Sequence, residues 1–337
     1  MTPTLTPMLL HLFWIGLGLA ILLLSGDLLV RGSVALAQRV RIPPMLIGLT
    51  IVAFGTSAPE LVIGVNAVLI GGEAGGLAIG NIVGSNIANV FLVLGVPALI
   101  YPTCCKQPLI RRNTTIMIGA TLLFIWLCLD GAHTLTKIDG AILFAGMMAF
   151  MGYAVYRARA MPGEGLVADL TEELEEMSGL PESTGAIIFF IGIAMIGLPL
   201  GSNFIVSGAV GLAMNAGISA TVIGLSIIAI GTSLPELATT VIAAVHRHSA
   251  VALGNVIGSN LFNILGIMGV TALVAPQPLI VEGRFLITEL WIMLAATFVL
   301  VPYSFLHLKM GRVSGVLFLG AYVLFIVALF RHHGLTP

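Results

Sequence analysis

Ten apolar stretches, each long enough to cross a lipid bilayer, make up most of this chain. They cover residues 8–30, 44–70, 76–101, 113–130, 138–157, 184–212, 219–245, 250–275, 285–303 and 313–331. A helix needs about 20 consecutive apolar residues to span the hydrocarbon core. Only 9% of the residues are charged, whereas a soluble domain carries about 25%. We therefore expect an all-α polytopic membrane protein with about ten transmembrane helices in a lipid bilayer.

The first apolar stretch is expected to be a transmembrane helix. No lysine or arginine precedes Arg31, so residues 8–30 lack the basic segment that opens a secretory signal peptide. The net charge of −1 gives no reason to expect a nucleic-acid partner. Both features are typical of an integral membrane protein that does not bind nucleic acid.

Basic residues are distributed unequally between the two ends of the predicted helices. The side that holds both termini carries Lys137, Arg284 and Arg331, and the opposite side carries the other 11 of the 14 lysines and arginines. Loops rich in lysine and arginine remain in the cytoplasm. We therefore expect both termini on the extracytoplasmic side.

A polar segment divides the chain into two halves. The first transmembrane half covers residues 1–158 and the second covers 184–337, with an acidic linker at 159–183 between them. The linker is too short to fold as a second domain, so it is expected to be a solvated cytoplasmic loop. A calcium-sensing loop is the alternative, because its acidic residues cluster at Glu164, Asp169, Glu172, Glu173, Glu175 and Glu176.

Two segments of the first half recur in the second half. Residues 48–60 read GLTIVAFGTSAPE and residues 224–236 read GLSIIAIGTSLPE, with nine of thirteen positions identical. Residues 80–99 and 254–273 share ten of twenty positions. Because each half contains five predicted helices, the second copy enters the membrane from the opposite face. Transporters built from such inverted repeats bind their substrates near the middle of the membrane, where the repeats meet.

Each repeat places one glutamate deep within the membrane. Glu60 lies 16 residues after Pro44 and 11 before Gly71, which is far from both ends at 1.5 Å per residue. Glu236 occupies the same place in the second half, and no lysine or arginine shares either helix at a similar depth. An ionisable group in this environment indicates an ion pathway or binding site. A cation is the expected partner.

Helix-breaking residues and hydroxyl groups surround both glutamates. Pro59 lacks an N–H donor, so we expect it to open its helix and free the carbonyl oxygens around Ala53. Pro235 and Ala229 correspond to them in the second half. The neighbouring hydroxyl groups belong to Thr56, Ser57, Thr232 and Ser233. The same Ser-x-x-Glu spacing also fits a capping box, which would give these residues a structural role instead.

One further helix in each half carries a stripe of polar residues spaced by four. The stripes are Asn81, Ser85 and Asn89, and Asn255, Ser259 and Asn263. Calcium takes six to eight oxygen ligands, and this inventory lacks the thiolates and imidazoles that zinc and copper favour. We expect a calcium site, with Asn81, Asn255 and the two prolines in supporting positions. The stripes could alternatively hydrogen-bond the helices together.

Three other polar residues carry weaker expectations. Asp27 is expected to mark a polar helix end rather than a second ion site. His246 and His248 fall in a short loop between two apolar stretches, where we expect them to be solvated.

The duplicated motifs resemble the two alpha repeats of the sodium/calcium exchangers in the calcium/cation antiporter superfamily. They are GTSAPE with GNIVGSNIAN, and GTSLPE with GNVIGSNLFN. The resemblance covers nearly the whole chain and is to the compact prokaryotic form. It implies a Ca2+/Na+ antiporter in the prokaryotic inner membrane, working by alternating access. It further implies a protein that is no enzyme and has no resident cofactor and no obligatory protein partner.

The resemblance also implies roles for individual residues. Glu60 and Glu236 match the acidic residues that bind calcium and share sodium sites. The hydroxyl groups of Thr56, Ser57, Thr232 and Ser233, the carbonyls of Ala53 and Ala229, and the side chains of Ser85, Asn89 and Ser259 match the other ligands. Asn263 departs from the pattern, because several members have an aspartate there. Two carboxylates still balance one calcium ion, but the coupling ion could then be H+ or K+ instead of Na+.

Two other classes of function are considered. A cation channel could also use a pair of glutamates, but duplicated broken helices favour a carrier. An intramembrane zinc protease or an ATP-driven pump would be expected to carry HExxH or GxxxxGK[ST], and neither motif occurs.

Overall fold

A computed structural model describes residues 5–70, 74–107, 109–130, 133–160, 179–216, 229–281 and 288–332. The acidic part of the linker, including Glu164 and Glu176, lies outside these ranges. The first half contains α1 (Leu5–Val40), α2 (Pro44–Ile47), η1 (Gly48–Val52), α3 (Ala53–Thr56), α4 (Ala58–Ile70), α5 (Ala74–Ala88), η2 (Asn89–Val93), α6 (Gly95–Ile100), α7 (Ile110–Leu129) and α8 (Lys137–Ala160).

The second half repeats this order of elements. It contains α10 (Thr184–Asn215), α12 (Ala229–Thr232), α13 (Leu234–Val245), α14 (Ser249–Leu261), η4 (Phe262–Ile267), α15 (Met268–Val274), α16 (Leu290–Leu306) and α17 (Arg312–His332). A short antiparallel pair of strands, β1 (Thr134–Leu135) and β2 (Leu279–Ile280), links the connection before α8 to the one after α15. Helices in both halves follow the predicted order of apolar stretches.

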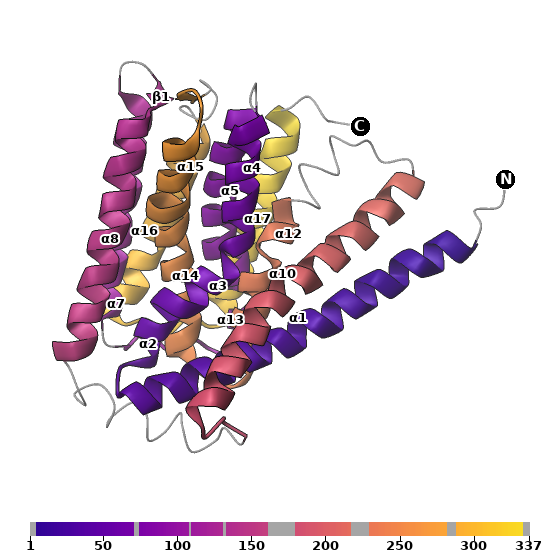
Figure 1. The fold of residues 1–337 in the computed structure, drawn as a ribbon, viewed down its shortest axis with the longest axis vertical. Coiled ribbons are helices and arrows are strands. Elements are labelled where there is room, and N and C mark those ends of the chain that lie inside the picture. Colours follow the sequence, from indigo (N-terminus) through magenta and orange to yellow (C-terminus); the bar gives the residue numbers. More distant parts are fainter. Residues whose placement is uncertain are drawn as a thin grey trace.

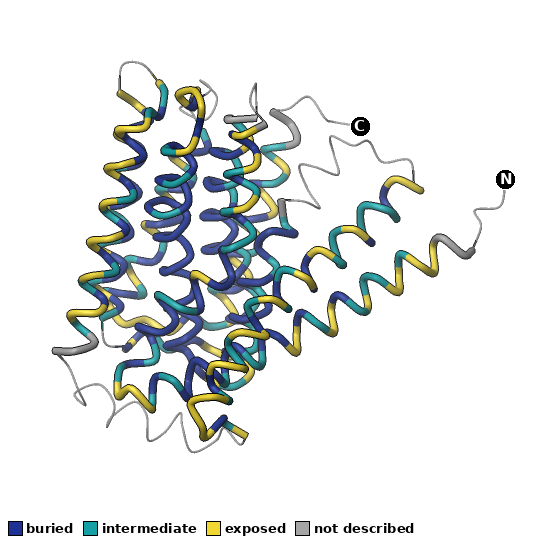
Figure 2. Tube along the Cα trace, in the orientation of Figure 1, coloured by how far each residue is buried: buried dark blue, intermediate teal, exposed yellow. Residues whose placement is uncertain are grey.

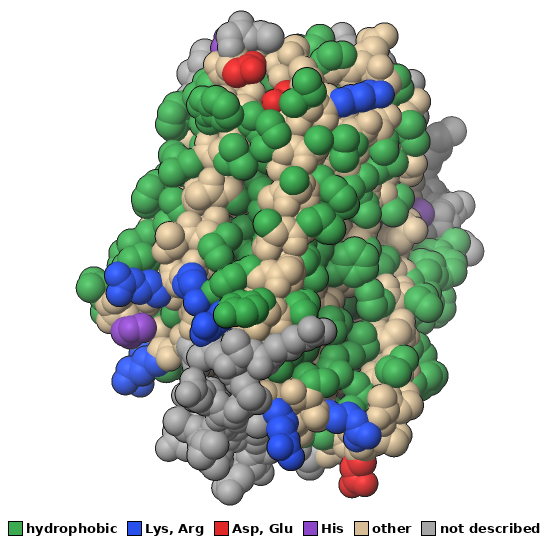
Figure 3. All heavy atoms as spheres, turned by 60° about the vertical axis from the view of Figure 1, so that its left-hand side comes forward, with side chains coloured by type: hydrophobic (Ala, Val, Ile, Leu, Met, Phe, Trp, Pro, Cys, Tyr) green, Lys and Arg blue, Asp and Glu red, His purple; other side chains and the backbone are tan. Residues whose placement is uncertain are grey.

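The helices confirm a polytopic membrane fold. Among the described residues, seven helices are long and apolar enough to cross a membrane, and the pair Pro44–Thr56 and Ala58–Leu69, bent by 46°, supplies an eighth span. The shorter apolar helices Leu234–Val245 and Leu290–Leu306 occupy the two remaining predicted stretches. Hydrophobic side chains cover most of the face shown in Figure 3, with lysine and arginine gathered mainly towards its lower end.

The long helices α1 and α10 lie side by side and tilt away from the other helices (Figure 1). Their backbones touch, because a Cβ atom added to Gly18 would lie 2.6 Å from the carbonyl oxygen of Gly201. Much of their outer surface is exposed, whereas the other helices enclose the buried core (Figure 2). The pair therefore forms a layer of its own against one side of the core.

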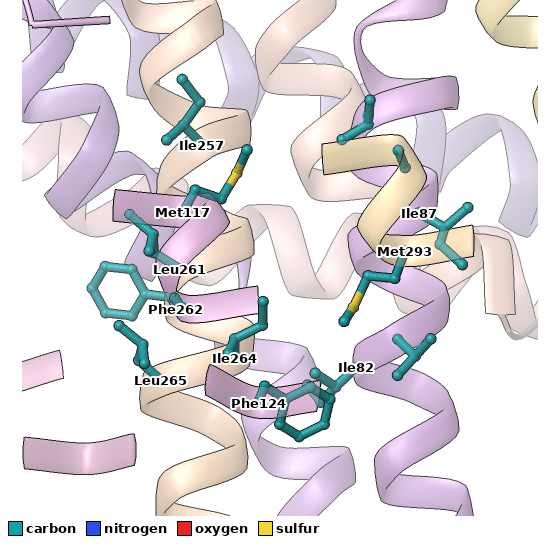
Figure 4. Packing of buried hydrophobic residues seen from close by; sticks show 14 of the residues in the cluster. Ile82, Ile87, Met117, Phe124, Ile257, Leu261, Phe262, Ile264, Leu265 and Met293 are labelled. Carbon is teal, nitrogen blue, oxygen red and sulfur yellow. The ribbon is translucent and has the colours of Figure 1, made fainter. Parts of the chain in front are cut away.

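The core joins helices from both repeats. Figure 4 shows Ile82 and Ile87 of α5, Met117 and Phe124 of α7 and Met293 of α16 near residues of α14 and η4. Every residue of α14 is buried, and this helix packs against α2, η1 and α3 of the first half. The second polar stripe is therefore held against the broken helix of the opposite repeat.

The breaks in the two motif helices differ in detail from the sequence-based expectation. The first break falls at Ser57, and Pro235 lies in the first turn of α13, as Pro59 does in α4. A proline is tolerated there because its missing N–H would have no helical partner. The π-helical segments η1, η2 and η4 also lie within the repeated segments. Such wide turns frequently mark functional sites.

The expectations that His248 is solvated and that Asp27 marks a helix end are wrong, whereas His246 stays partly exposed. Asp27 lies inside α1, where it pairs with Arg31 and its Oδ1 lies 2.7 Å from Nε2 of His246. His248 is only 2% exposed, at the start of α14. Burial in this connection is therefore confined to its end at α14, since Val245 is 55% exposed and Arg247 is exposed as well.

We expect the buried His248 to make the protein less stable in acid. Burial, with a smaller contribution from His246, lowers the pKa of His248 from 6.5 to about 4. The unfolded chain then binds the proton more readily, so stability falls as the pH drops from about 6.5 towards 4. The loss reaches about 3 kcal/mol when the pKa difference is converted. Melting temperatures in detergent should therefore fall less steeply with pH for His248→Asn than for the wild type.

Candidate ion-binding site

The two broken helices bring Glu60 and Glu236 into the interior. Each glutamate lies in the first turn of the helix that follows a break, α4 or α13. Both side chains are fully buried. The N-terminus of a helix favours a negative charge, because its first N–H groups have no partner within the helix. The breaks therefore position two carboxylates at sites that can stabilise them.

Hydrogen bonds connect both glutamates to a network that spans the two repeats, directly for Glu236 and through Ser85 for Glu60. Ser57 Oγ donates to Glu236 Oε1 at 2.9 Å. Ser85 Oγ donates to Glu60 Oε1 at 3.4 Å and accepts from Asn263 Nδ2 at 3.2 Å. Ser85 also lies 3.5 Å from Ser233, between their hydroxyl oxygens. One polar cluster thus contains predicted site residues from both halves.

A second group of contacts links Thr56 to α14. Thr56 Oγ1 donates to Asn255 Oδ1 at 3.2 Å and lies 3.4 Å from Ser259 Oγ. Asn255 Nδ2 in turn donates to Thr240 Oγ1 at 3.0 Å. Asn255 therefore connects two side chains that flank the cluster, as expected of a supporting residue.

Within the part of the chain that the structure describes, four buried oxygen atoms of the cluster have no hydrogen-bond partner. They are Glu60 Oε2, Glu236 Oε2, Asn89 Oδ1 and Asn263 Oδ1. Leaving a buried acceptor unpaired costs about 1–3 kcal/mol, and more for a charged group. All four are the oxygen types that calcium binds. Among the described residues no group of three His, Cys, Asp or Glu could hold a metal, so a cation bound here would take its remaining ligands from neutral oxygens.

The other predicted residues lie nearby but are less clearly oriented. The Ala53 carbonyl accepts from Ser57 N at 3.0 Å and from Thr56 Oγ1 at 3.3 Å, so the break does not leave it without a donor. Ala229 begins α12, and Thr232 at its end is 7% exposed. Asn81 lies on α5 with a buried Nδ2 that has no partner. Their roles as ligands or supports stay predictions.

Sequence reasoning missed two residues that contact the cluster. Thr240 Oγ1 donates to the backbone oxygen of Glu236 at 2.7 Å. Asn260 Oδ1 accepts from Asn89 Nδ2 at 3.0 Å. The four-residue spacing from Glu236 could have indicated Thr240, because residues four apart share a helical face. The position of Asn260 required the packing of α14 against η2, which the sequence does not show.

We expect Ser57→Ala to weaken cation binding. Its hydroxyl is 2% exposed and donates the 2.9 Å hydrogen bond that holds Glu236. A hydrogen bond to a charged group contributes about 1.5–3 kcal/mol, which corresponds to a tenfold or larger loss of affinity. Isothermal titration of the purified protein with Ca2+ measures this change. Ser207→Ala on α10 is the control, because the Ser207 hydroxyl is exposed and bonds only Asn203.

Comparison with known proteins identifies the class of protein that this fold and cluster define. Residues 10–156 and 186–331 match the family described as sodium/calcium exchanger protein. The solved structure of the sodium-calcium exchanger NCX_Mj, soaked with 10 mM Na+ and 10 mM Sr2+, matches with a TM-score of 0.79 and 29% identity. The match covers 95% of this chain and 98% of that one.

Two relatives resemble the chain over nearly their whole length. The inner membrane protein YrbG of Escherichia coli is 33% identical, covering 93% of this chain and 94% of its own. The sodium/calcium exchanger MaX1 of Methanosarcina acetivorans is 31% identical, covering 93% and 97%. The chain belongs to the sodium/calcium exchanger protein family. It is therefore a multi-pass membrane protein of a transporter family rather than an enzyme.

Proposed function

We propose that this chain is a secondary-active antiporter that exchanges Ca2+ for Na+ across a prokaryotic inner membrane. The observation that carries the proposal is the cluster of four unpartnered buried oxygens, two of them from the fully buried Glu60 and Glu236. A cation supplies the positive charge that such a cluster lacks. The family match and the likeness to NCX_Mj support the same ions.

Charge balance explains why the protein would exchange ions rather than leak them. One Ca2+ neutralises the two carboxylates, and so do monovalent cations that share the same ligands. An empty site leaves two buried negative charges, which are costly to move through a dry region. Only the occupied states then cross readily between the inward-facing and outward-facing conformations. This difference couples the movement of one ion to the return of the other.

The layer formed by α1 and α10 is the moving part that we propose. It tilts away from the other helices (Figure 1) and carries neither repeated motif, and its apolar face packs against residues such as Ala238 and Val251. Polar contacts also tie it to the other helices: Ser202 Oγ donates to Gly231 O at 2.5 Å, and Asp27 pairs with His246. A slide of this pair would expose the cluster to alternate sides. No cofactor and no obligatory protein partner is required for this mechanism.

The orientation follows from the distribution of charge. The end of α8 and the beginning of α10 lie at the same end of the molecule, opposite the beginning of α1 (Figure 1). The basic loops belong to the end that holds the linker, so this end faces the cytoplasm. Both termini then lie on the extracytoplasmic side.

Coupling to H+ or K+ is the alternative that Asn263 keeps open. Several family members have an aspartate at this position. Here it is an asparagine, whose Nδ2 donates to Ser85 Oγ, so the site has one negative charge fewer. Radiolabelled Ca2+ uptake into proteoliposomes, with outward Na+, H+ and K+ gradients in parallel, tests the proposal. Uptake driven by Na+ alone is the expected result. Uptake driven only by another gradient would change the coupling ion, and single-channel currents would contradict antiport.

A further inference from the structure

The repeated Gly-Ser-Asn sequence ends in Asn86 in the first half and in Asn260 in the second half. Neither asparagine belongs to the predicted set of ligands. Both are buried, at 2% and 1% exposure. Asn86 Nδ2 donates to Ile82 O on its own helix at 2.8 Å. Asn260 instead reaches across the repeats, because its Oδ1 accepts from Asn89 Nδ2 at 3.0 Å. The two copies of one motif therefore make different contacts.

The orientation of the Asn89 amide decides whether it attracts or repels a cation. Its oxygen is a ligand for hard cations, whereas its NH2 group is a donor with the wrong polarity. The side chain is fully buried, with Oδ1 unpartnered and Nδ2 engaged by Asn260. A flipped amide would place Asn89 Oδ1 against Asn260 Oδ1, where two acceptors repel. The Asn260 oxygen thus selects one orientation.

Asn260 is itself held in place from outside the cluster. Its Nδ2 lies 3.7 Å from Sδ of Met117 on α7, a weak acceptor in the hydrophobic core. The Asn263 amide has no equivalent support, because its Nδ2 donates to Ser85, which also contacts Glu60. The orientation of the Asn89 amide is therefore set by Asn260, which is not a predicted ligand. The orientation of the Asn263 amide is set by Ser85, which is a predicted ligand.

We propose that Asn260 is a positioning residue, which fixes the Asn89 amide with its oxygen towards the transported cation. Asn260 does not contact the cation in this role. The inference rests on the proposed function, because it assigns a part within the same site. A fixed amide avoids the loss of affinity that follows when only a fraction of the protein presents the binding-competent orientation.

Substitutions at Asn260 should change the KM for Ca2+ more than the maximal rate. Asn260→Leu removes the acceptor, and we expect the KM for exchange in proteoliposomes to rise about tenfold, the change that corresponds to one lost hydrogen bond. Asn260→Ser keeps a neutral acceptor oxygen, so its KM should lie between those of Asn260→Leu and the wild type. Asn260→Ala gives the same shift as leucine with a smaller side chain, should leucine prevent folding.

A second substitution distinguishes positioning from a structural role. In an Asn89→Ala background, residue 89 has no amide to orient, so adding Asn260→Leu should change the KM by less than about twofold. Asn86→Leu is the matched control at the equivalent motif position, and it should leave the KM near the wild-type value.

The outcomes separate this role from the proposed function. Equal KM shifts for Asn86→Leu and Asn260→Leu, or a tenfold shift that persists beside Asn89→Ala, would overturn the positioning role. If the wild type takes up Ca2+ and Asn260→Leu has the same KM for Ca2+ as the wild type, the positioning role is overturned and the proposed function is not. A wild-type protein without Ca2+ uptake under any gradient would overturn both the role and the proposed function.

Discussion

Glu60→Gln and Glu236→Gln should each reduce Ca2+ exchange at least about 100-fold. Both carboxylates are fully buried, and each has one oxygen held by a serine and one without a partner. Glutamine keeps the shape but removes the charge and adds a donor. Removing one partner of a buried charge interaction costs about 3–5 kcal/mol, which corresponds to a factor of 100 or more. Radiolabelled Ca2+ uptake, normalised to reconstituted protein, measures the loss.

Glu289→Gln is the matched control for this prediction. Glu289 is also buried, at 6% exposure, and its Oε2 also lacks a partner. It lies at the start of α16, apart from the two broken helices. We expect its substitution to change uptake by no more than about twofold, because Glu289 lies outside the polar cluster that holds Glu60 and Glu236. If all three variants lost transport equally, loss of a buried charge anywhere would explain the effect, and the assignment of the two glutamates would be wrong.

Much of the fold could be predicted because it follows from two simple features of the sequence. Apolar length gave the spans, since a bilayer fixes the length of a helix that crosses it. The duplicated segments indicated an inverted repeat, because five helices per half is an odd number. The π-helical segments and the burial of His248 could not be predicted in the same way. They depend on how α14 packs against the opposite repeat, and no local pattern encodes that packing.

The sequence indicated which residues form the candidate site, but not which of them hydrogen-bond to one another. The structure brings Glu60, Ser85 and Asn263 into one hydrogen-bonded chain, although they lie in three different helices. Motif spacing could not show that Ser57 bonds Glu236, or that Asn260 rather than Asn86 contacts the cluster. The repeats are similar in sequence, yet their side chains make unequal contacts. The sequence symmetry therefore overstates the symmetry of the site.

Gly258→Ala should destabilise the protein and disable the site, although it adds a single methyl group. A Cβ atom at Gly258 would lie 2.7 Å from both the Leu49 carbonyl oxygen and the Ala53 Cβ. These atoms belong to η1 and α3, so α14 must move away from the broken helix. Overpacking of this kind costs about 1–3 kcal/mol. The same movement lengthens the contacts from Thr56 to Asn255 and Ser259, so we expect Ca2+ affinity to fall about tenfold.

Gly84→Ala tests whether the packing or the glycine itself matters. Gly84 occupies the equivalent motif position in the first repeat, where an added Cβ would meet nothing within 4 Å. Alanine favours helix by about 1 kcal/mol over glycine, so Gly84→Ala should leave the melting temperature unchanged or raise it, with normal Ca2+ binding. Thermal unfolding and Ca2+ titration of both variants measure the contrast. Equal effects would contradict this explanation, because Gly258 lies against the backbone of the opposite repeat and Gly84 does not.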